Sequence, residues 1–438
     1  MRWLVILAVA VRVVAAAVLV AGPWTNEPSE LGGWDVARFQ QMADEPGRPW
    51  ADHEVEYPPG SVVLIEALAG GGVVRTHRLL VGLSLAVDLG VAALVGRLGG
   101  ERAAGTYLLL GLPLVPMGLL RFDLWAALAA IGALAVAAAT ASSSPTADDR
   151  PGRPGTRRAL PMPLPALAAD VAVGLLVAAG ALVKVWPALL VAALWAGRRG
   201  RAAAASLAAM AVSGAAWLAW AGAGLDPVRQ VLSLRGATGW HLESIPGSLV
   251  ALFGSSQPEL QLDAFRIGHL DPRVVLAGRV LTLGVVAILA VGVRRHRVGR
   301  GADASEAGPG GPAGLALVML GATAALVVTA PLLSPQFLLW LTPWAALQSG
   351  GTPVGAGDRG DDRRMLVLLT AVATTVTGAT LTVFGPPDVG RTVPALLLLG
   401  RDVALVALIG VAVRTALRPS GTPVGAAQPR PTPSSSVA

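Results

Sequence analysis

Apolar segments long enough to cross a membrane recur along the whole chain, and they restrict its fold more than any other feature. A transmembrane helix needs roughly 20 apolar residues in succession, or fewer where neighbouring helices shield it. Only 14% of the 438 residues are charged, whereas about a quarter are charged in a soluble protein. We therefore predict an all-α integral membrane protein with about 12 transmembrane helices. The candidate spans are 3–22, 78–97, 104–120, 122–141, 166–183, 185–197, 202–221, 274–293, 313–333, 336–348, 365–384 and 394–413.

The placement of arginine predicts which loops face the cytoplasm, because short cytoplasmic loops of membrane proteins are enriched in basic residues. The basic loops are 97–102, 150–158, 198–201, 294–300, 363–364 and 414–418. The segments left outside are 23–77, 121–123, the turn at Lys184, 222–273, 331–336 and 385–393. The first exterior loop is therefore long. Its apolar piece 61–72 is too short to span, so we expect it to dip into the membrane and return, or to lie on the surface. The alternative is that 61–74 crosses and a later boundary is misplaced.

The remaining segments predict one membrane domain over 1–418 in the plasma membrane. Residues 3–22 could be a signal peptide, but no convincing cleavage site follows them, which favours a retained first helix. The loops 142–165, 298–312 and 349–364 are rich in Pro, Gly, Ser and charge and read as flexible cytoplasmic linkers. Residues 419–438 form a Pro- and Ser-rich tail, predicted to be disordered and cytoplasmic.

The sequence lacks the residues that several kinds of functional site require. The chain has no cysteine and only five histidines, which form no His-x-x-x-His pair, and it has no Asp-x-Asp pair and no Gly-rich phosphate loop. We therefore predict no metal, no cofactor and no nucleotide site. The net charge of +7 comes almost entirely from arginine, which is typical of cytoplasmic loops rather than of nucleic-acid binding.

Short polar motifs follow one another at the ends of the predicted spans. They are Asp35 after the first span, Tyr57-Pro58-Pro59, Arg121-Phe122-Asp123, Lys184-Val185-Trp186-Pro187, Glu243-Ser244-Ile245-Pro246 and Ser334-Pro335-Gln336-Phe337. In this order and spacing, over residues 33 to about 345, the chain resembles the polyprenyl-phosphate-sugar-dependent glycosyltransferases of the GT-C fold. Within them it is most similar to the actinobacterial α-mannosyltransferase-like group, glycosyltransferase family 87. Two departures are Arg38-Phe39, where relatives often have a Tyr, and Pro49-Trp50, where they often have Pro-Tyr.

The resemblance implies a GT-C-like bundle that transfers a sugar, mannose in the closest group, with inversion on the extracytoplasmic face. The donor would be a polyprenyl-phosphate sugar in the lipid bilayer, and the acceptor a glycolipid or lipid-linked glycan. Such a transfer needs a carboxylate to take the acceptor's proton, and cations or N–H donors to hold the departing phosphate. Nucleic acid has no part in it.

The resemblance makes Asp35 the candidate base, although an Asp at this position would also cap a short helix. Arg121 would hold the donor phosphate, with Asp123 near the acceptor or supporting the cation; the alternative is an ordinary exterior turn with an Arg–Asp pair. Lys184 is the only lysine in the chain, and its compact ammonium suits a phosphate. It could equally snorkel from a helix end.

The other candidates belong to the same exterior segments. His241 could donate a hydrogen bond to the phosphate, Glu243 could bind sugar hydroxyls, and both could instead lie on a solvated loop. Tyr57 and Gln336 complete the candidate donor site, with helix capping as the alternative for Gln336. Trp34, Trp50 and Trp240 could stack on sugars or anchor the chain at the membrane interface. Asp88 and Asp170 lie within spans and should pair internally or face polar cavities.

Two functions from other classes compete with the enzyme. A transporter or lipid flippase would place its polar residues near the membrane midplane, often in two similar halves. This chain has no evident internal repeat, and most of its polar motifs gather in long segments at one face. An inactive structural subunit of a cell-envelope complex is the third alternative, and retention of Asp35, Lys184 and Asp123 together argues against it.

Overall fold

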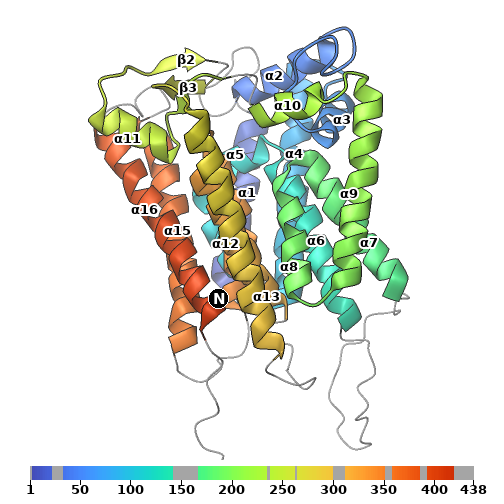
Figure 1. Cartoon of the computed structure of the whole chain (residues 1–438). Coiled ribbons are helices and arrows are strands. Elements are labelled where there is room, and N and C mark those ends of the chain that lie inside the picture. The colour runs from blue at the N-terminus through green and yellow to red at the C-terminus, as the bar shows by residue number, and fades with distance from the viewer. Residues whose placement is uncertain are drawn as a thin grey trace, which may run out of the picture.

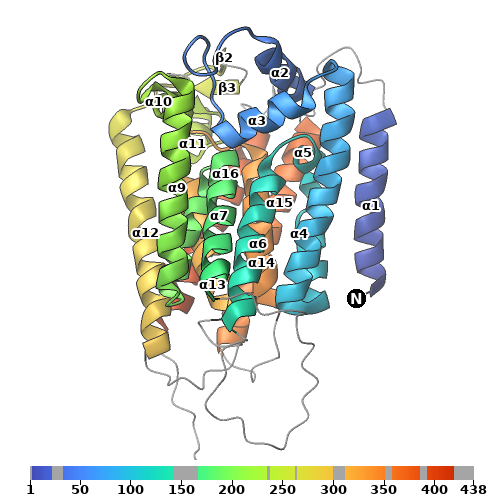
Figure 2. The same ribbon diagram turned by 90° about the vertical axis from the view of Figure 1, so that its right-hand side faces the viewer.

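The computed structural model describes residues 2–21, 33–141, 166–233, 237–261, 264–298, 311–350, 358–384 and 392–418. The predicted linker 142–165 and the predicted tail 419–438 lie outside these residues, as do most of the predicted linker 298–312 and part of 349–364. Long helices stand side by side in a bundle (Figures 1 and 2). Four of the short helices lie with the strands at one end of it.

Nine helices in the described residues are long and apolar enough to cross a membrane, which makes the chain a multi-pass integral membrane protein. They are α1 (Arg2–Ala21), α4 (Val73–Leu110), α6 (Asp123–Ala141), α7 (Ala166–Val183), α9 (Gly200–Ala221), α12 (Pro272–Val298), α13 (Pro312–Thr329), α15 (Asp358–Phe384) and α16 (Thr392–Leu417). The expected number of about 12 spans is met only in part, because three predicted spans are broken into shorter pieces.

The three broken segments each combine a 3₁₀ turn with a short α-helix. They are η1 (Leu112–Leu114) with α5 (Val115–Leu119), η2 (Trp186–Leu189) with α8 (Leu190–Ala196), and η4 (Pro335–Trp340) with α14 (Thr342–Ser349). Each begins with a proline in its first two positions. Proline has no N–H to donate and obstructs the preceding turn, so a helix can start at these residues but cannot run through them.

Helix α4 contains the predicted span 78–97 and the first part of 104–120, and it reverses direction between them. Gly100 has φ 81°, outside helical geometry, a value that glycine adopts readily because it has no Cβ. The Tyr107 hydroxyl donates to the Asp88 carboxylate, 19 residues away in sequence. On a straight helix these residues would be about 28 Å apart. The two arms of α4 therefore run antiparallel, as the separate predictions for 78–97 and 104–120 require.

Asp88 forms a buried ion pair that attaches α1 to α4. The Nε atom of Arg12 lies 2.6 Å from Asp88 Oδ2, and the two side chains are 1% and 7% exposed. Arg12 also donates to the Ala8 carbonyl at 3.3 Å. The prediction that Asp88 pairs internally is therefore confirmed. Asp170 is only partly buried on α7, and it forms no ion pair with any residue that the structure describes.

One end of the bundle carries the predicted first exterior segment and the segment that follows α9. It contains α2 (Gly33–Asp44), α3 (Pro59–Leu68), α10 (Asp226–Ser233) and α11 (Ile245–Phe253). The same end contains a small antiparallel sheet of three strands, β1 (Trp240–His241), β2 (Glu259–Gln261) and β3 (Ala264–Ile267). Their order in the sheet is β1-β3-β2. Trp240 pairs with Ile267, and Leu260 with Phe265. The bundle is all-α as predicted, but this small sheet was not anticipated.

The uncertain piece 61–72 forms the short helix α3, which lies with α2 at this end of the bundle (Figure 2). The Ser61 hydroxyl donates to the Val183 carbonyl at the end of α7 at 2.7 Å. The piece therefore does not cross the bundle. The turn at Gly100, the start of α9 and the end of α16 lie at the opposite end, with predicted basic loops (Figures 1 and 2). There Arg418 contacts Asp362 at 3.1 Å.

We expect Arg12→Met to destabilise the protein by about 3–5 kcal/mol, because it leaves the Asp88 carboxylate buried without its cation. Thermal or denaturant unfolding in detergent measures the effect. The control is Arg2→Gln, which removes a pair with Glu101 at 3.9 Å whose side chains are 86% and 74% exposed; exposed pairs contribute about 0–1 kcal/mol. Equal stability of the two variants would contradict a clamping role for Arg12.

Candidate functional site

A cavity of about 770 Å³ opens at the end of the bundle that carries the sheet. Residues of α2, α10, β1, β3, α12, α13, η2 and η4 contribute to its wall. It brings together predicted site residues from six distant parts of the sequence: Asp35, Tyr57, Arg121, Lys184, His241, Glu243 and Gln336. Asp123 does not line the cavity and lies behind Lys184.

Asp35 lies in the first turn of α2 and forms an ion pair with Arg121. The two side chains are 22% and 18% exposed. Burial raises the pKa of the Asp35 carboxyl above its ordinary value, while Arg121 and Lys184 oppose that rise. Asp35 is therefore a carboxylate that attracts protons more strongly than an exposed Asp, which is the property that a general base needs.

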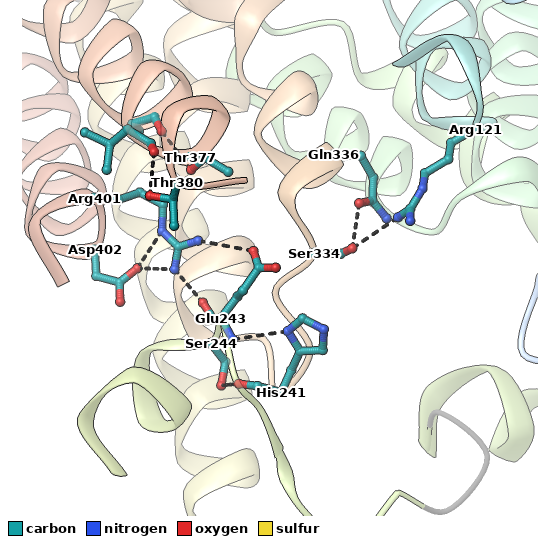
Figure 3. A network of polar contacts seen from close by, with 12 residues as sticks. Arg121, His241, Glu243, Ser244, Ser334, Gln336, Thr377, Thr380, Arg401 and Asp402 are labelled. Carbon is teal, nitrogen blue, oxygen red and sulfur yellow. Dashed lines mark hydrogen bonds and ion pairs between the residues drawn. The ribbon is translucent and has the colours of Figure 1, made fainter. Parts of the chain in front are cut away.

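Arg121 lies in the turn between α5 and α6, and residues of the turn before η4 hold it from the other side. Its Nη1 donates to the Ser334 hydroxyl at 3.2 Å, and that hydroxyl donates to Gln336 Oε1 at 2.5 Å (Figure 3). The buried Nε of Arg121 has no hydrogen-bond partner among the described residues. A guanidinium that is held at one edge and unsatisfied at another can donate a hydrogen bond to a further oxygen atom.

Lys184 follows the last residue of α7 and is held near the cavity by a carboxylate and an aromatic ring. Its Nζ lies 3.9 Å from Asp123 Oδ2 and 5.0 Å from the centre of the Tyr57 ring. Asp123 is fully buried, and Trp340 Nε1 donates to its other oxygen at 2.6 Å. Asp123 is therefore an ion-pair partner of Lys184, and its expected roles near the acceptor or in support of Arg121 remain predictions.

The cavity contains more cations than carboxylates. Besides Arg121 and Lys184, its wall includes Arg38, Arg266 and Arg279. Arg38 pairs with Glu56 at 3.4 Å. These residues were not among the predicted ones. Nothing in the sequence distinguishes a cavity-lining arginine of an exterior segment, such as Arg38 or Arg266, from a solvated one. Arg279, however, lies inside the predicted span 274–293 and carries the same signal as Asp88. An excess of positive charge in a partly enclosed space favours an anionic ligand.

His241 lies in β1, and its environment keeps it neutral. Burial lowers the pKa of the imidazole to about 3, with Arg266 and Arg401 contributing in the same direction. The Glu243 N–H donates to His241 Nδ1 at 3.3 Å, so the ring proton belongs on Nε2. The main-chain N–H of His241 donates to the Pro331 carbonyl at 3.1 Å. His241 is therefore neutral, and a hydrogen bond to the Leu333 backbone already engages its ring.

Glu243 forms part of the opposite wall, next to a buried pair on α16 (Figure 3). Burial raises the pKa of Glu243 to about 7, against the opposing effect of Arg401. Arg401 donates to the Glu243 carbonyl, and its Nη1 lies 3.8 Å from Glu243 Oε2. Arg401 and Asp402 were missed, although adjacent opposite charges inside the predicted span 394–413 carry the same signal that singled out Asp88.

The cavity continues from these polar groups to the apolar surface of the bundle. Leu189, Leu283 and Leu326 line it from η2, α12 and α13. Leu283 is 67% exposed, so the cavity reaches the outer face of α12. A ligand with both a polar head and an apolar chain suits this combination of surfaces.

Of the predicted aromatic residues Tyr57 lines the cavity, but Trp50 and Trp240 do not. Trp50 packs against Trp217 and Trp220, with ring centres 5.5 and 5.3 Å away. The Trp34 side chain lies outside the described part of the structure. Trp186, Phe337 and Trp340 line the wall instead. The Phe337 and Trp340 rings stack with centres 4.2 Å apart.

The described residues contain no group of three or more His, Asp or Glu side chains arranged to hold a metal ion. The predicted absence of a metal remains a prediction.

No protein-family model and no curated protein matches the chain. Among solved structures it is similar to ArnT from Cupriavidus metallidurans in the apo state, with 16% identity and a TM-score of 0.43 over 94% of this chain and 77% of that chain. It is also similar to ArnT from the same organism bound to undecaprenyl phosphate, with 17% identity and a TM-score of 0.41 over 94% of this chain and 77% of that chain. The Archaeoglobus fulgidus oligosaccharyltransferase tethered with an acceptor peptide has 13% identity and a TM-score of 0.37 over 95% of this chain and 56% of that chain. Membership of glycosyltransferase family 87 stays a prediction, and the proposals below rest on this chain's own residues.

We expect Glu243→Gln to become more stable relative to the wild type as pH rises. The pKa of Glu243 is about 7 in the folded state against an ordinary 4.5. Between these values only the folded state holds the proton, so wild-type stability falls with pH until Glu243 ionises. The shift corresponds to a difference of about 3 kcal/mol. Unfolding of both proteins at pH 5 and pH 8 measures it, and parallel pH profiles would contradict the burial of an ionisable Glu243.

Proposed function

We propose that this chain is a membrane glycosyltransferase that moves a sugar from a polyprenyl-phosphate donor to a glycolipid or lipid-linked glycan. The observation that carries the proposal is the Asp35–Arg121 pair with Lys184 in one cavity. A carboxylate of raised pKa and two cations are the groups that such a transfer needs, and they come from motifs far apart in the sequence. The order of these motifs resembles glycosyltransferase family 87.

The reaction follows from the placement of these groups. The acceptor hydroxyl oxygen forms a bond to the anomeric carbon, and the bond from that carbon to the phosphate oxygen breaks. Asp35 takes the hydroxyl proton, and the bonding electrons leave with the polyprenyl phosphate. Arg121 and Lys184 stabilise the negative charge that develops on that phosphate. A single displacement of this kind inverts the anomeric configuration.

A lipid-linked donor is supported by the apolar part of the cavity. Leu283 lines it and is exposed on the outer face of α12. A polyprenyl chain could remain among lipids while its phosphate reaches the cations. We propose mannose as the sugar on the resemblance alone, and an extracytoplasmic site because the described basic loops 97–102, 198–201 and 414–418 lie at the opposite end of the bundle.

The alternative of a transporter or flippase receives less support. The candidate site gathers at one end of the bundle rather than at its middle, where a transporter binds its substrate. The Arg12–Asp88 pair does lie within the spans, but its side chains are 1% and 7% exposed and it lines no described cavity. Its contacts attach one helix to another.

We expect Asp35→Asn to lower transfer from radiolabelled polyprenyl-phosphate mannose by about 10²–10⁴-fold, the usual contribution of a general base. The asparagine keeps the shape of the side chain but cannot take the proton. Asp44→Asn is the matched control, because Asp44 lies on the same helix and contacts Gln40 at 2.9 Å, away from the cavity. Full activity of Asp35→Asn would remove Asp35 from the chemistry.

We expect Lys184→Met to raise the KM for the donor by about tenfold or more, because hydrogen bonds to charged groups contribute about 1.5–3 kcal/mol. Lys184→Arg should restore part of the loss, since it returns the positive charge beside Asp123. Steady-state kinetics with varied donor and saturating acceptor measure both. If the donor KM of a folded Lys184→Met protein equals that of the wild type, Lys184 does not bind the phosphate.

A further inference from the structure

Arg401 and Asp402 are buried charges within a membrane-spanning helix that the proposed reaction does not use. They are 0% and 2% exposed, and Arg401 lies nine residues after the first residue of α16. At the helical rise this is about 13.5 Å along the helix axis. Charged residues at such positions are costly and are found where they pair or serve a function.

Arg401 contacts its neighbour Asp402, and it also contacts Glu243 in the cavity wall (Figure 3). Its Nε and Nη2 donate to Asp402 Oδ1 at 2.9 and 2.7 Å. Nη2 also donates to the main-chain carbonyl of Glu243. Asp402 therefore neutralises the guanidinium, and the remaining donors are directed at a residue of the cavity wall.

An apolar contact reinforces this attachment. Leu398, one turn before Arg401 and Asp402 on α16, packs with Leu242 and Ile267 in a small buried cluster. Leu242 precedes Glu243 directly, and Ile267 belongs to β3. The segment from β1 to α11 is thus joined to α16 by the polar contacts of Arg401 and by the apolar contact of Leu398. Within that segment the Ser244 hydroxyl donates to the His241 carbonyl at 2.7 Å, which links the residues on the two sides of Glu243.

We propose that Arg401 and Asp402 form a latch that attaches the segment from β1 to α11 to α16 and thereby positions the Glu243 carboxyl in the cavity wall. The attachment itself follows from the contacts above. Its consequence for sugar transfer rests on the proposed function. Arg401 is in this sense a positioning residue, because it acts on substrate only through Glu243.

Burial and the charges around Glu243 determine whether its carboxyl group carries a proton. Arg401 and Asp402 face it from α16, Arg121 from the turn before α6, and neutral His241 from β1. Burial raises the pKa of Glu243 to about 7 although Arg401 and Arg121 oppose it, so Glu243 keeps its proton up to about that pH. A protonated Glu243 can donate one hydrogen bond and accept others, which suits the hydroxyls of a sugar.

Hydrogen–deuterium exchange of the full-length protein tests the latch without requiring activity. The variant R401M/D402N removes both charges and leaves neither buried alone. We expect amides of residues 240–253 to exchange at least about tenfold faster in it, with α12 and α13 unchanged. The matched control is R414M/D362N, which removes an Arg–Asp pair at the other end of α16 and should leave 240–253 unchanged. Unchanged exchange at 240–253 in folded R401M/D402N overturns the proposal.

A pH profile of transfer tests the consequence for Glu243. We expect wild-type activity to fall as pH rises through about 7, and the pH profile of Glu243→Gln to lack this fall whatever its activity at low pH. Because Arg401 lowers the pKa of Glu243 more strongly than Asp402 raises it, the fall should shift to higher pH in R401M/D402N. Arg401→Lys should restore the wild-type profile in part, and R414M/D362N should match the wild type.

The two experiments separate the latch from the enzyme. If R401M/D402N keeps the wild-type kcat, KM and pH profile, Arg401 does not position Glu243 for transfer. If the wild type transfers no sugar from polyprenyl phosphates, the proposed function fails while the exchange experiment still decides whether the latch exists.

Discussion

A charge that leaves water must bring a counter-charge with it, and this constraint explains how the bundle is assembled. Arg12 has Asp88, Arg121 has Asp35, and Arg401 has Asp402. Each of these arginines also contacts a further residue, because one carboxylate cannot satisfy all the donors of a guanidinium. The pairs therefore fix helix to helix, or the polar end to the spans, at defined points. Apolar packing between helices in a lipid environment gives no such unique register.

The Asp35–Arg121 pair has an additional effect, because it lies in a cavity and not in a packed interface. Its two side chains remain 22% and 18% exposed, whereas Arg12 and Arg401 are 1% and 0% exposed. The first pair can exchange its partner for a ligand, and the other two cannot do so without opening the bundle. The same kind of contact thus holds the architecture in one place and prepares a site in another.

The sequence predicts the helices well because the thickness of the bilayer imposes one length on every span. It also predicts most of the candidate site, since Asp35, Lys184, Arg121 and Glu243 belong to motifs at the ends of spans. Contacts between distant residues are another matter. Nothing local indicates that Glu243 meets Arg401, that Arg12 meets Asp88, or that Trp340 rather than Trp50 reaches the cavity. The strands of the sheet span only two to four residues each, too few for an alternating pattern to be recognised.

The prolines that begin η1, η2 and η4 have a consequence for the balance between stability and activity. Met117, Trp186 and Gln336, from the three broken segments, all line the cavity. An uninterrupted helix at each place would satisfy more backbone groups and fill more of the bundle. It would also occupy the volume in which a substrate must fit. Replacing these prolines to improve thermal tolerance would therefore work against the proposed sugar transfer, because stability and activity often oppose one another at active sites.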